Sequence, residues 1–507
     1  MRTSILAPRF RPGRQVVLTW SIPDSFGGMT GAFLHRSRAF VRLGNRAVDI
    51  LTLDDRLDYA ELDDELRERG DLIDGIRLIN IWDWLREHDA TAQKERPEPV
   101  PELPASGAGI GEHMRGGTVM LRERASDDGS GVEAADRFRD DGSLLVTDRR
   151  DPATGSRRVV LYDRDGSPLR SWGSAWGIYR YWLDQLIGHQ EAFMIVDSKT
   201  AARFARTYRR RNVVTLHLLH GSHRTADGSA LSSSRRSVLE NLGDFDSVVA
   251  LTEGQRADLI RDLGPQENLA VIPNGFDAAS VRQRGKRARR RGSGLMLASL
   301  IKRKRVSHAI KAVVLASNSV DTSLDVFGEG ERRPLLEELI QSLDATDRVR
   351  LRGHASGARS YFSTADFMLL TSSAEGLPLA LVEGMAAGCI PIAYDIAYGP
   401  SDVIVDGRNG FLVPAGDIDA MAARIVELQR MPEGAVTAMR RRAMDTAERF
   451  DDRAVTRAWA REMEKAWERK HAASDPGSLA ARSRRLAGRA RRRISRVSGR
   501  YELSDGT

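Results

Sequence analysis

Apolar runs alternate with amphipathic segments along most of the chain, and this alternation predicts an α/β protein. The run RQVVLTWSI at 14–22 is typical of a strand, and residues 32–44 after it carry apolar side chains at helical spacing. The same alternation returns at about residue 172 and continues to about residue 430. Strands that alternate with helices form parallel sheets covered by helices, so we expect two Rossmann-like domains.

Residues 97–171 have a different pattern. Short alternating runs such as GSLLVTD and RRVVLYD lie between the turn sequences DDG, ATG and RDG. Short strands separated by turn residues predict antiparallel hairpins instead of strand-helix-strand units. We therefore expect a small antiparallel β insertion within the first Rossmann-like domain.

A chain of 507 residues is too long for one hydrophobic core, and we expect it to divide into five parts. These are an N-terminal Rossmann-like domain at 1–96 and 172–275, the inserted β-rich domain at 97–171, a C-terminal Rossmann-like domain at 276–436, crossing helices at 437–470, and a basic tail at 471–507 that we expect to be disordered.

The stretch TSSAEGLPLALVEGMAAG at 371–388 joins an apolar strand to an amphipathic helix through a short polar loop. Glu375 stands in this loop, and Glu383 lies two turns into the helix. Pro378 fixes the start of the helix, where a missing N–H costs nothing. The free N–H groups of the first turn, at the positive end of the helix dipole, favour an anion such as a phosphate.

Two interpretations of this acid pair are consistent with the residues alone. In one, both carboxylates accept hydrogen bonds from sugar hydroxyls, while the backbone between them holds a diphosphate. In the other, Glu375 is an ordinary loop residue and Glu383 faces solvent, as most helical glutamates do.

The segment EGLPLALVEGMAAGCIPIAYDIAYGPSDVIVDGRNGFLV resembles the Glu-x7-Glu block of family-4 retaining glycosyltransferases. Its YGPSDVI part is similar to the teichoic acid α-glycosyltransferases, typified by poly(glycerol-phosphate) α-glucosyltransferase, and the similarity covers residues 14–465. It implies the GT-B architecture, in which an N-terminal acceptor domain and a C-terminal nucleotide-sugar-binding domain face a cleft. It also implies metal-independent, retaining transfer of a hexose from UDP-glucose or UDP-GlcNAc to a polyol-phosphate polymer, with no cofactor besides the donor substrate.

The resemblance assigns donor-binding roles to residues of both domains. A glycine loop after the first strand approaches the diphosphate, and a lysine in the second domain faces the leaving group. A glycine and a histidine at a strand end cradle the nucleotide base, and the helix start described above meets the phosphates. The corresponding residues are Gly27, Gly28, Lys304, Gly353, His354, Gly376, Leu377, Pro378 and Glu383.

The catalytic residues that the resemblance implies are Glu375, Lys304 and a histidine. His220 and His223 follow the strand NVVTLHLL, at the edge where open α/β sheets bind ligands. The family has a histidine near the donor sugar and the acceptor hydroxyl, and His220 corresponds to it. A neutral imidazole accepts a proton near pH 7. A role for His223 instead, a purely structural role, and a zinc site that includes His217 are the alternatives.

The loop ASLIKRKR departs from the family pattern. The family has an arginine just after the strand and a lysine five residues later, both directed at the leaving diphosphate. Lys304 matches the lysine, but Ser299 stands in place of the arginine. Lys302, Arg303 or Arg305 is able to supply the missing charge, and the sequence does not distinguish among them.

The formal net charge is +8, and arginine clusters at 282–292 and 482–500 account for much of it. Such clusters favour anionic partners. Together with the resemblance they predict a polyanionic polyol-phosphate acceptor and a peripheral contact of the tail with an anionic membrane, whereas solvated arginines without a ligand are the alternative. We expect no nucleic-acid partner, and a homo-oligomer is left open.

A single cysteine, Cys389, excludes a disulfide within the chain, and no apolar run reaches the roughly 18 to 20 residues of a membrane span. We therefore expect a cytoplasmic enzyme, at the inner face of the plasma membrane if the tail binds lipid. Two other functions remain. One is the same chemistry on a Ser/Thr-rich protein or another glycan, and the other is a non-catalytic binding subunit, which Ser299 favours.

Overall fold

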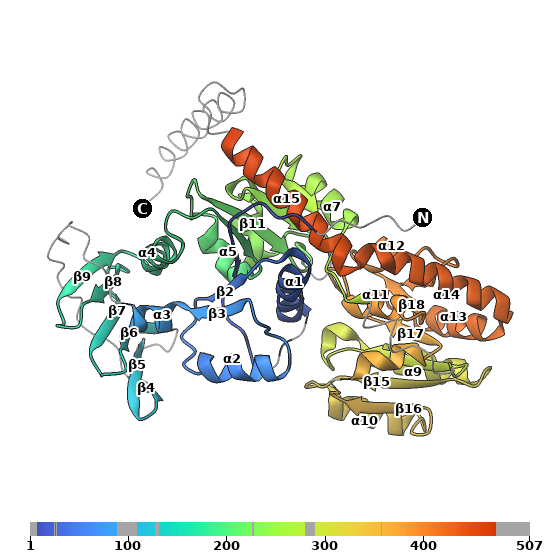
Figure 1. The fold of residues 1–507 in the computed structure, drawn as a ribbon. Coiled ribbons are helices and arrows are strands. Elements are labelled where there is room, and N and C mark those ends of the chain that lie inside the picture. The colour runs from blue at the N-terminus through green and yellow to red at the C-terminus, as the bar shows by residue number, and fades with distance from the viewer. Residues whose placement is uncertain are drawn as a thin grey trace, which may run out of the picture.

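The computed structural model describes residues 8–24, 26, 28–88, 109–126, 131–151, 153–225, 228–278, 289–355 and 357–472. These residues form two lobes, each built around a parallel sheet, and a separate antiparallel sheet (Figure 1). The antiparallel sheet extends from the first lobe on the side away from the second lobe. The expected α/β fold with two Rossmann-like domains is confirmed.

The first lobe contains a seven-stranded parallel sheet in the order β13-β12-β11-β10-β1-β2-β3. Its strand order reverses between β1 and β10, so the loops that follow these two strands diverge at the carboxyl edge. The strands are β1 (Arg14–Leu18), β2 (Val48–Thr52), β3 (Ile76–Asn80), β10 (Ala192–Val196), β11 (Val213–Leu219), β12 (Ser247–Ala250) and β13 (Leu269–Val271).

Helices cover both faces of this sheet because alternate strand residues point to opposite sides. Val17 and Ile195 belong to one hydrophobic cluster, whereas Val16 and Val196 belong to another. The helical elements of the first lobe are α1 (Gly28–Gly44), α2 (Tyr59–Glu68), α3 (Ile81–Glu87), α4 (Ala175–Ile187), α5 (Lys199–Ala205), α6 (Ser233–Leu239), η1 (Leu242–Asp244) and α7 (Glu253–Leu263).

A six-stranded antiparallel sheet lies between α3 and α4 in the chain, and it confirms the expected β insertion. Arg137 joins it to the first lobe through an ion pair with Asp55 at 2.6 Å and a cation-π contact with Trp82 at 3.9 Å. The strands, which pair in chain order, are β4 (Ile110–Arg115), β5 (Thr118–Ala125), β6 (Val132–Phe138), β7 (Leu144–Arg150), β8 (Arg157–Tyr162) and β9 (Pro168–Trp172).

The second lobe contains a six-stranded parallel sheet in the order β16-β15-β14-β17-β18-β19. Its strands are β14 (Ser293–Leu297), β15 (Ser323–Phe327), β16 (Val349–Gly353), β17 (Phe367–Leu370), β18 (Ile390–Asp395) and β19 (Phe411–Pro414). Its helical elements are η2 (Lys302–Lys304), α9 (Val306–Ser317), α10 (Arg333–Ser342), η3 (Ala358–Ser363), α11 (Leu379–Ala386), α12 (Pro400–Val403), α13 (Ile418–Arg430), α14 (Glu433–Ala447) and η4 (Glu448–Phe450).

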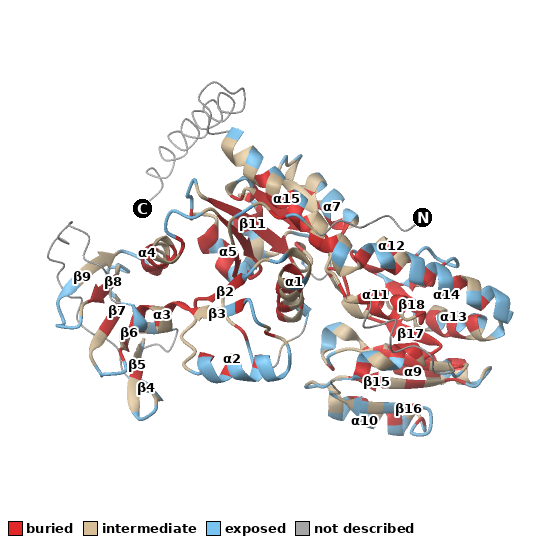
Figure 2. Ribbon diagram, viewed as in Figure 1, coloured by how far each residue is buried: buried red, intermediate tan, exposed pale blue. Residues whose placement is uncertain are grey.

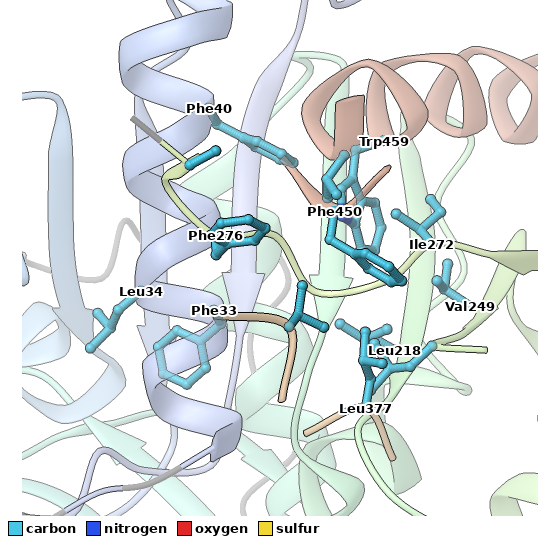
Figure 3. Close-up of a cluster of buried hydrophobic side chains, with 14 of the residues drawn as sticks. Phe33, Leu34, Phe40, Leu218, Val249, Ile272, Phe276, Leu377, Phe450 and Trp459 are labelled. Carbon is cyan, nitrogen blue, oxygen red and sulfur yellow. The ribbon is translucent and has the colours of Figure 1, made fainter. Parts of the chain in front are cut away.

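The last described helix, α15 (Asp452–Ala472), crosses from the second lobe back to the first (Figure 1). The amide of Asp452 donates to the carbonyl of Phe276 at 3.1 Å, which ties the start of α15 to the segment between the lobes. Trp459 of α15 then packs against Phe40 of α1 within a cluster of buried side chains (Figure 3). A single hydrophobic cluster therefore contains residues from both lobes and from the crossing helix.

The strands of the two parallel sheets are mostly buried, and the helices expose their outer faces (Figure 2). Burial raises the pKa of the Cys389 thiol to about 12, so this cysteine stays protonated at neutral pH. No helix in the described part of the chain combines the length and apolar character needed to cross a bilayer.

Trp459 is 1% exposed, and we expect its packing to hold the crossing helix on the first lobe. Trp459→Ala should lower the free energy of unfolding by about 3 to 5 kcal/mol, because a large buried side chain is removed. Urea unfolding followed by circular dichroism measures the change. Leu335→Ala on α10 is the control, since Leu335 is 52% exposed and its loss should be nearly neutral. Equal midpoints for the two variants would contradict this assignment.

Candidate active site

Two loops meet at the carboxyl edge of the second sheet. The sheet places β14 next to β17, where the strand order reverses. Ligands of open α/β sheets bind outside such a switch point. The loop after β14 carries Lys304 and the loop after β17 carries Glu375, so two of the predicted catalytic residues lie at this position.

Side chains of the second loop hold the first loop in place. The Thr371 hydroxyl shares its hydrogen between the carbonyl oxygens of Lys304 at 2.8 Å and Arg305 at 3.0 Å. The Ser373 amide donates to the carbonyl of Arg303 at 2.9 Å. Arg305 has a φ of 46°, a left-handed conformation that costs about 1 kcal/mol for a residue other than glycine. These hydrogen bonds stabilise that conformation, and with it the turn that carries Lys304.

Glu375 is buried between two cations. One carboxylate oxygen lies 2.5 Å from Lys304 Nζ, and the other lies 3.3 Å from the Arg303 guanidinium. Arg303 also donates to the carbonyl of Ala374 at 2.6 Å. Burial opposes ionisation, but the charges of Lys304 and Arg303 outweigh it and lower the pKa of Glu375. The carboxylate is therefore ionised at neutral pH.

The structure distinguishes among the three basic residues near Ser299. Ser299 itself is exposed in the loop after β14. Among the described contacts, Glu375 forms ion pairs with Lys304 and with Arg303. Among the same contacts it forms none with Lys302 or Arg305. A second cation thus stands beside the acid, and it comes from a position four residues after Ser299.

Glu383 lies on α11 and does not face solvent. It is 8% exposed, and its carboxylate accepts a hydrogen bond from Arg359 of η3 at 2.8 Å. The ion pair offsets part of the cost of burying the charge. The interpretation of Glu383 as a solvent-exposed helical residue is therefore wrong.

Gly376 brings the two lobes into direct contact. A Cβ atom added at Gly376 would lie 2.4 Å from the carbonyl oxygen of His220 and 3.0 Å from a methyl carbon of Leu251, both in the first lobe. The first of these distances is too short for any side chain. Because Gly376 follows Glu375, this contact brings the loop that carries the acid against the loop that carries His220.

The neighbours of Gly376 have different roles from one another. Leu377 is 5% exposed, and its side chain packs with Leu218 and Val249 of the first lobe (Figure 3). Any contact of Leu377 with a ligand is therefore limited to its backbone. Pro378 precedes α11 directly and has no N–H to offer to a phosphate.

Asp197 orients His220. It directly follows β10 and accepts a hydrogen bond from His220 Nε2 at 2.6 Å. The Arg36 guanidinium of α1 binds the same carboxylate through two hydrogen bonds, at 3.0 and 2.6 Å. Burial works against ionisation, yet the Arg36 charge and the His220 hydrogen bond lower the pKa of Asp197 to about 2. An ionised Asp197 only accepts, so Nε2 carries hydrogen and Nδ1 is left as the acceptor of a neutral His220.

Both of these supporting residues were missed in the sequence analysis. Asp197 had a recognisable signal, because it stands at the carboxyl end of the strand FMIV, where ligand-binding residues collect. Arg36 had none, since it lies within an amphipathic helix and is separated from Asp197 by 161 residues.

His217 and His223, the other two histidines of this segment, are buried and paired within the protein. His223 is fully buried, with Nε2 3.0 Å from Asp262 and Nδ1 3.4 Å from the Tyr398 hydroxyl. His217 faces the carbonyl of Val196 at 2.9 Å, and burial lowers its pKa to about 4. In the described part of the chain, no group of three His, Cys, Asp or Glu side chains is arranged to hold a metal ion.

The YGPSDVI segment docks the second lobe onto the first. The Tyr398 hydroxyl donates to Asp258 of α7 at 2.8 Å, and its ring stacks on His223 with centroids 5.8 Å apart. Asp402 accepts a hydrogen bond from the amide of Gly254 at 3.0 Å. This segment therefore helps to set the position of Gly376 against His220.

The remaining predicted donor residues lie apart from this contact. Gly27 is outside the described residues, and Gly28 is the first residue of α1 with open space where a side chain would be. Gly353 is the last residue of β16, and its φ of 76° is one that residues with a side chain rarely adopt. His354, the next residue, is exposed. Because β15 lies between β16 and β14, these two residues are one strand removed from the loop that carries Lys304.

Part of the first arginine cluster supports the fold. Arg289 donates to the carbonyl oxygens of Phe362 and Ala365, and Arg291 donates to that of Leu428. These two arginines are therefore occupied within the second lobe. Residues 281–288 and the tail from residue 473 lie outside the described residues.

Two family models match consecutive parts of the chain. The family described as "Glycosyl transferases group 1" matches residues 282–449, and "Glycosyltransferase Family 4" matches residues 138–280. The first match contains the Lys304 and Glu375 loops, and the second contains Asp197 and His220. The chain belongs to the GT-B glycosyltransferases. The resemblance found in the sequence is thereby confirmed.

Two curated relatives resemble this glycosyltransferase over most of its length. Poly(ribitol-phosphate) alpha-N-acetylglucosaminyltransferase of Staphylococcus aureus (strain COL) is 23% identical over 452 residues, which cover 79% of this chain and 90% of the relative. Poly(glycerol-phosphate) alpha-glucosyltransferase of Bacillus subtilis (strain 168) is 20% identical over 466 residues, which cover 82% and 69%.

A solved structure shares the fold of this glycosyltransferase. The S. aureus TarM G117R mutant, in complex with Fondaparinux, alpha-GlcNAc-glycerol and UDP, superimposes with a TM-score of 0.67 at 18% identity. The match covers 89% of this chain and 100% of the TarM chain. The likeness extends over both lobes and identifies the architecture.

We expect Gly376→Ala to impair transfer because the added methyl group forces the Glu375 loop away from His220. A displacement of about 1 Å in an active site can lower the rate about 100-fold, and we expect a loss of this size. Gly434→Ala on α14 is the matched control, because its Cβ meets open space. Transfer rates and thermal unfolding measured together distinguish a displaced loop from an unfolded protein. A wild-type rate in Gly376→Ala would show that the close contact is dispensable.

Proposed function

We propose that this glycosyltransferase moves a hexose, with retention of configuration, from a UDP-sugar to a hydroxyl of a polyol-phosphate polymer of the teichoic acid type. The observation that carries the proposal is the buried Glu375, held between Lys304 and Arg303 and placed beside His220 by Gly376. The names of the two curated relatives support the acceptor class. Those names differ in the sugar, so UDP-glucose and UDP-GlcNAc are both candidate donors.

In this proposal the second lobe binds the donor. Glu375 accepts hydrogen bonds from hydroxyls of the sugar, and Glu383 accepts from the ribose. Lys304 and the start of α11 neutralise the charge that develops on the departing diphosphate, which is the electrostatic role that a metal fills in other transferases. Gly353 and His354 lie beside the base, and Gly28 approaches the diphosphate from the first lobe.

Transfer with retention needs the acceptor hydroxyl to arrive on the face that the diphosphate leaves. The bond from the acceptor oxygen to the anomeric carbon forms as the bond from that carbon to the phosphate oxygen breaks. The acceptor proton passes to the departing phosphate, so no protein nucleophile is required. His220, held by Asp197, orients the hydroxyl through its free Nδ1, and the protein acts mainly by positioning and charge stabilisation.

Arg303 takes the role of the arginine that Ser299 replaces. Its guanidinium already lies 3.3 Å from one carboxylate oxygen of Glu375, whereas Lys304 contacts the other. An arginine matches phosphate oxygens through two parallel N–H groups, so it is suited to a diphosphate that enters beside Glu375. This assignment removes the main argument for a non-catalytic subunit, since two cations remain at the acid.

The direct test is to incubate the purified protein with UDP-glucose or UDP-GlcNAc and with glycerol-phosphate or ribitol-phosphate polymers in excess chelator. Mass spectrometry of the products then shows whether a sugar has been added. We expect one sugar to be added to a polyol hydroxyl without a divalent metal. Transfer to a Ser/Thr-rich protein alone would establish the alternative acceptor. If the protein neither transfers nor hydrolyses any UDP-sugar, the result would favour the non-catalytic subunit.

Glu375→Gln and Lys304→Met each remove one charge of the buried pair. We expect either variant to lower kcat at least about 100-fold, the scale of removing one group that stabilises the transition state. Circular dichroism verifies the fold. Arg424→Met is a control of the same kind, because Arg424 of α13 forms ion pairs with Asp406 and Glu427 and is not part of the proposed site. Wild-type rates from both site variants would remove the site assignment.

Arg303→Ala tests the second cation, and Ser299→Arg tests whether its charge can be relocated. We expect Arg303→Ala to lower kcat by about 10- to 100-fold, in line with the loss of one charged donor. Adding Ser299→Arg to that variant should restore part of the rate, since Ser299 is exposed and leaves room for a longer side chain. Steady-state transfer at saturating donor and acceptor measures both effects. An unchanged rate in Arg303→Ala would show that Lys304 acts alone.

A further inference from the structure

Arg235 carries a charge that the described residues leave without a partner. It lies on α6, and no hydrogen bond, ion pair or aromatic contact of its guanidinium is found in the described part of the chain. Other arginines around this site are paired, such as Arg36 with Asp197 and Arg224 with Asp262. The guanidinium of Arg235 is therefore an exception among its neighbours.

The position of Arg235 is next to the predicted catalytic histidine. A Cβ atom added at Gly221, the residue after His220, would lie 3.6 Å from Arg235 Nη2. The charge of Arg235 also acts on His217 and His223, which precede and follow His220 in the chain. Burial lowers the pKa of both histidines, and the charge of Arg235 lowers it further. The guanidinium thus lies at the carboxyl edge of β11, where ligands of this sheet bind.

Arg235 is partly buried, and its guanidinium nitrogens are not among the fully buried polar atoms, so a ligand can reach them. Burial lowers its pKa from the ordinary arginine value, although it stays charged at neutral pH. A charge removed from water without a counterion destabilises a protein unless a ligand supplies the counterion. Lys199 of α5 adds a second cation nearby, as its Nζ lies 3.4 Å from the hydroxyl of Ser234, the residue before Arg235.

We propose that Arg235 binds a phosphate of the acceptor, adjacent to the hydroxyl that His220 orients. This inference rests on the proposed function and adds to it a residue that selects the acceptor. A guanidinium binds phosphate oxygens through two parallel hydrogen bonds, which fixes the distance from the phosphate to the neighbouring polyol hydroxyl. A repeating polyol-phosphate offers this combination of anion and hydroxyl at every unit.

The donor diphosphate is the other phosphate that Arg235 is chemically able to bind. The cations at Glu375 belong to the second lobe, whereas Arg235 lies on the first lobe together with Asp197 and His220. In this proposal Arg235 of the first lobe binds the acceptor phosphate, and the cations of the second lobe bind the donor diphosphate. Acceptor binding and donor turnover must therefore be measured separately.

The experiment compares Arg235→Gln with Arg236→Gln. The two residues are neighbours on α6. Arg236 is exposed, with its Nε 4.0 Å from a carboxylate oxygen of Glu240, so the control removes one positive charge that faces solvent. Three quantities are measured: KM for a glycerol-phosphate or ribitol-phosphate oligomer, transfer to free glycerol or ribitol, and hydrolysis of the UDP-sugar without acceptor. Calorimetry with the oligomer in the absence of donor measures binding independently of catalysis.

We expect Arg235→Gln to raise KM for the phosphate oligomer about tenfold, the effect of losing one charge-assisted contact. Its calorimetric affinity should fall by the same factor, and Arg235→Lys should recover part of it. Transfer to the neutral polyol and hydrolysis of the UDP-sugar should match those of Arg236→Gln.

Equal oligomer affinities for Arg235→Gln and Arg236→Gln would overturn the inference. A rise in KM for the UDP-sugar during hydrolysis would also overturn it, because the guanidinium would then serve the donor. If no sugar is transferred by the wild type but the oligomer binds through Arg235, the proposed reaction fails and the phosphate site stands.

Discussion

No side chain fits between Gly376 and the carbonyl oxygen of His220, and this close contact determines the geometry of the site. It joins the loop of one sheet to the loop of the other at a single point. Leu377 continues the contact by packing into a hydrophobic cluster of the first lobe, and Tyr398 adds a hydrogen bond to Asp258. The polar groups of the site are therefore held in register by packing, which is stiff because protein interiors are as dense as crystals.

Each lobe contributes a buried carboxylate with two cationic or hydrogen-bonding partners. In the second lobe Glu375 contacts Lys304 and Arg303, and in the first lobe Asp197 contacts Arg36 and His220. Both acids have a lowered pKa because the nearby charges outweigh burial. The two acids differ in what they support: Glu375 fixes cations that can meet a diphosphate, whereas Asp197 fixes the tautomer and orientation of a histidine.

Arginines have unequal roles that the net charge does not reveal. Arg137 attaches the antiparallel sheet to the first lobe, and Arg289 binds carbonyl oxygens within the second lobe. Arg303 stands beside the buried acid, and Arg235 has no partner among the described residues. The overall charge of +8 is compatible with polyanionic partners, but only the location of each guanidinium separates a structural group from one available to a ligand.

The strands and helices of both lobes could be predicted from the amino-acid pattern, because apolar periodicity follows directly from which side chains each element buries. The turn residues also predicted the antiparallel insertion, and the family pattern identified the loop that carries Glu375. The amino-acid pattern left open which basic residue lies beside Glu375, which of the two histidines is fully buried, and which residues support His220. The folded structure shows that Arg303 lies beside Glu375, that His223 is buried and that Asp197 and Arg36 bind at His220. These contacts join residues far apart in the chain, and a local pattern carries no information about which distant side chains meet.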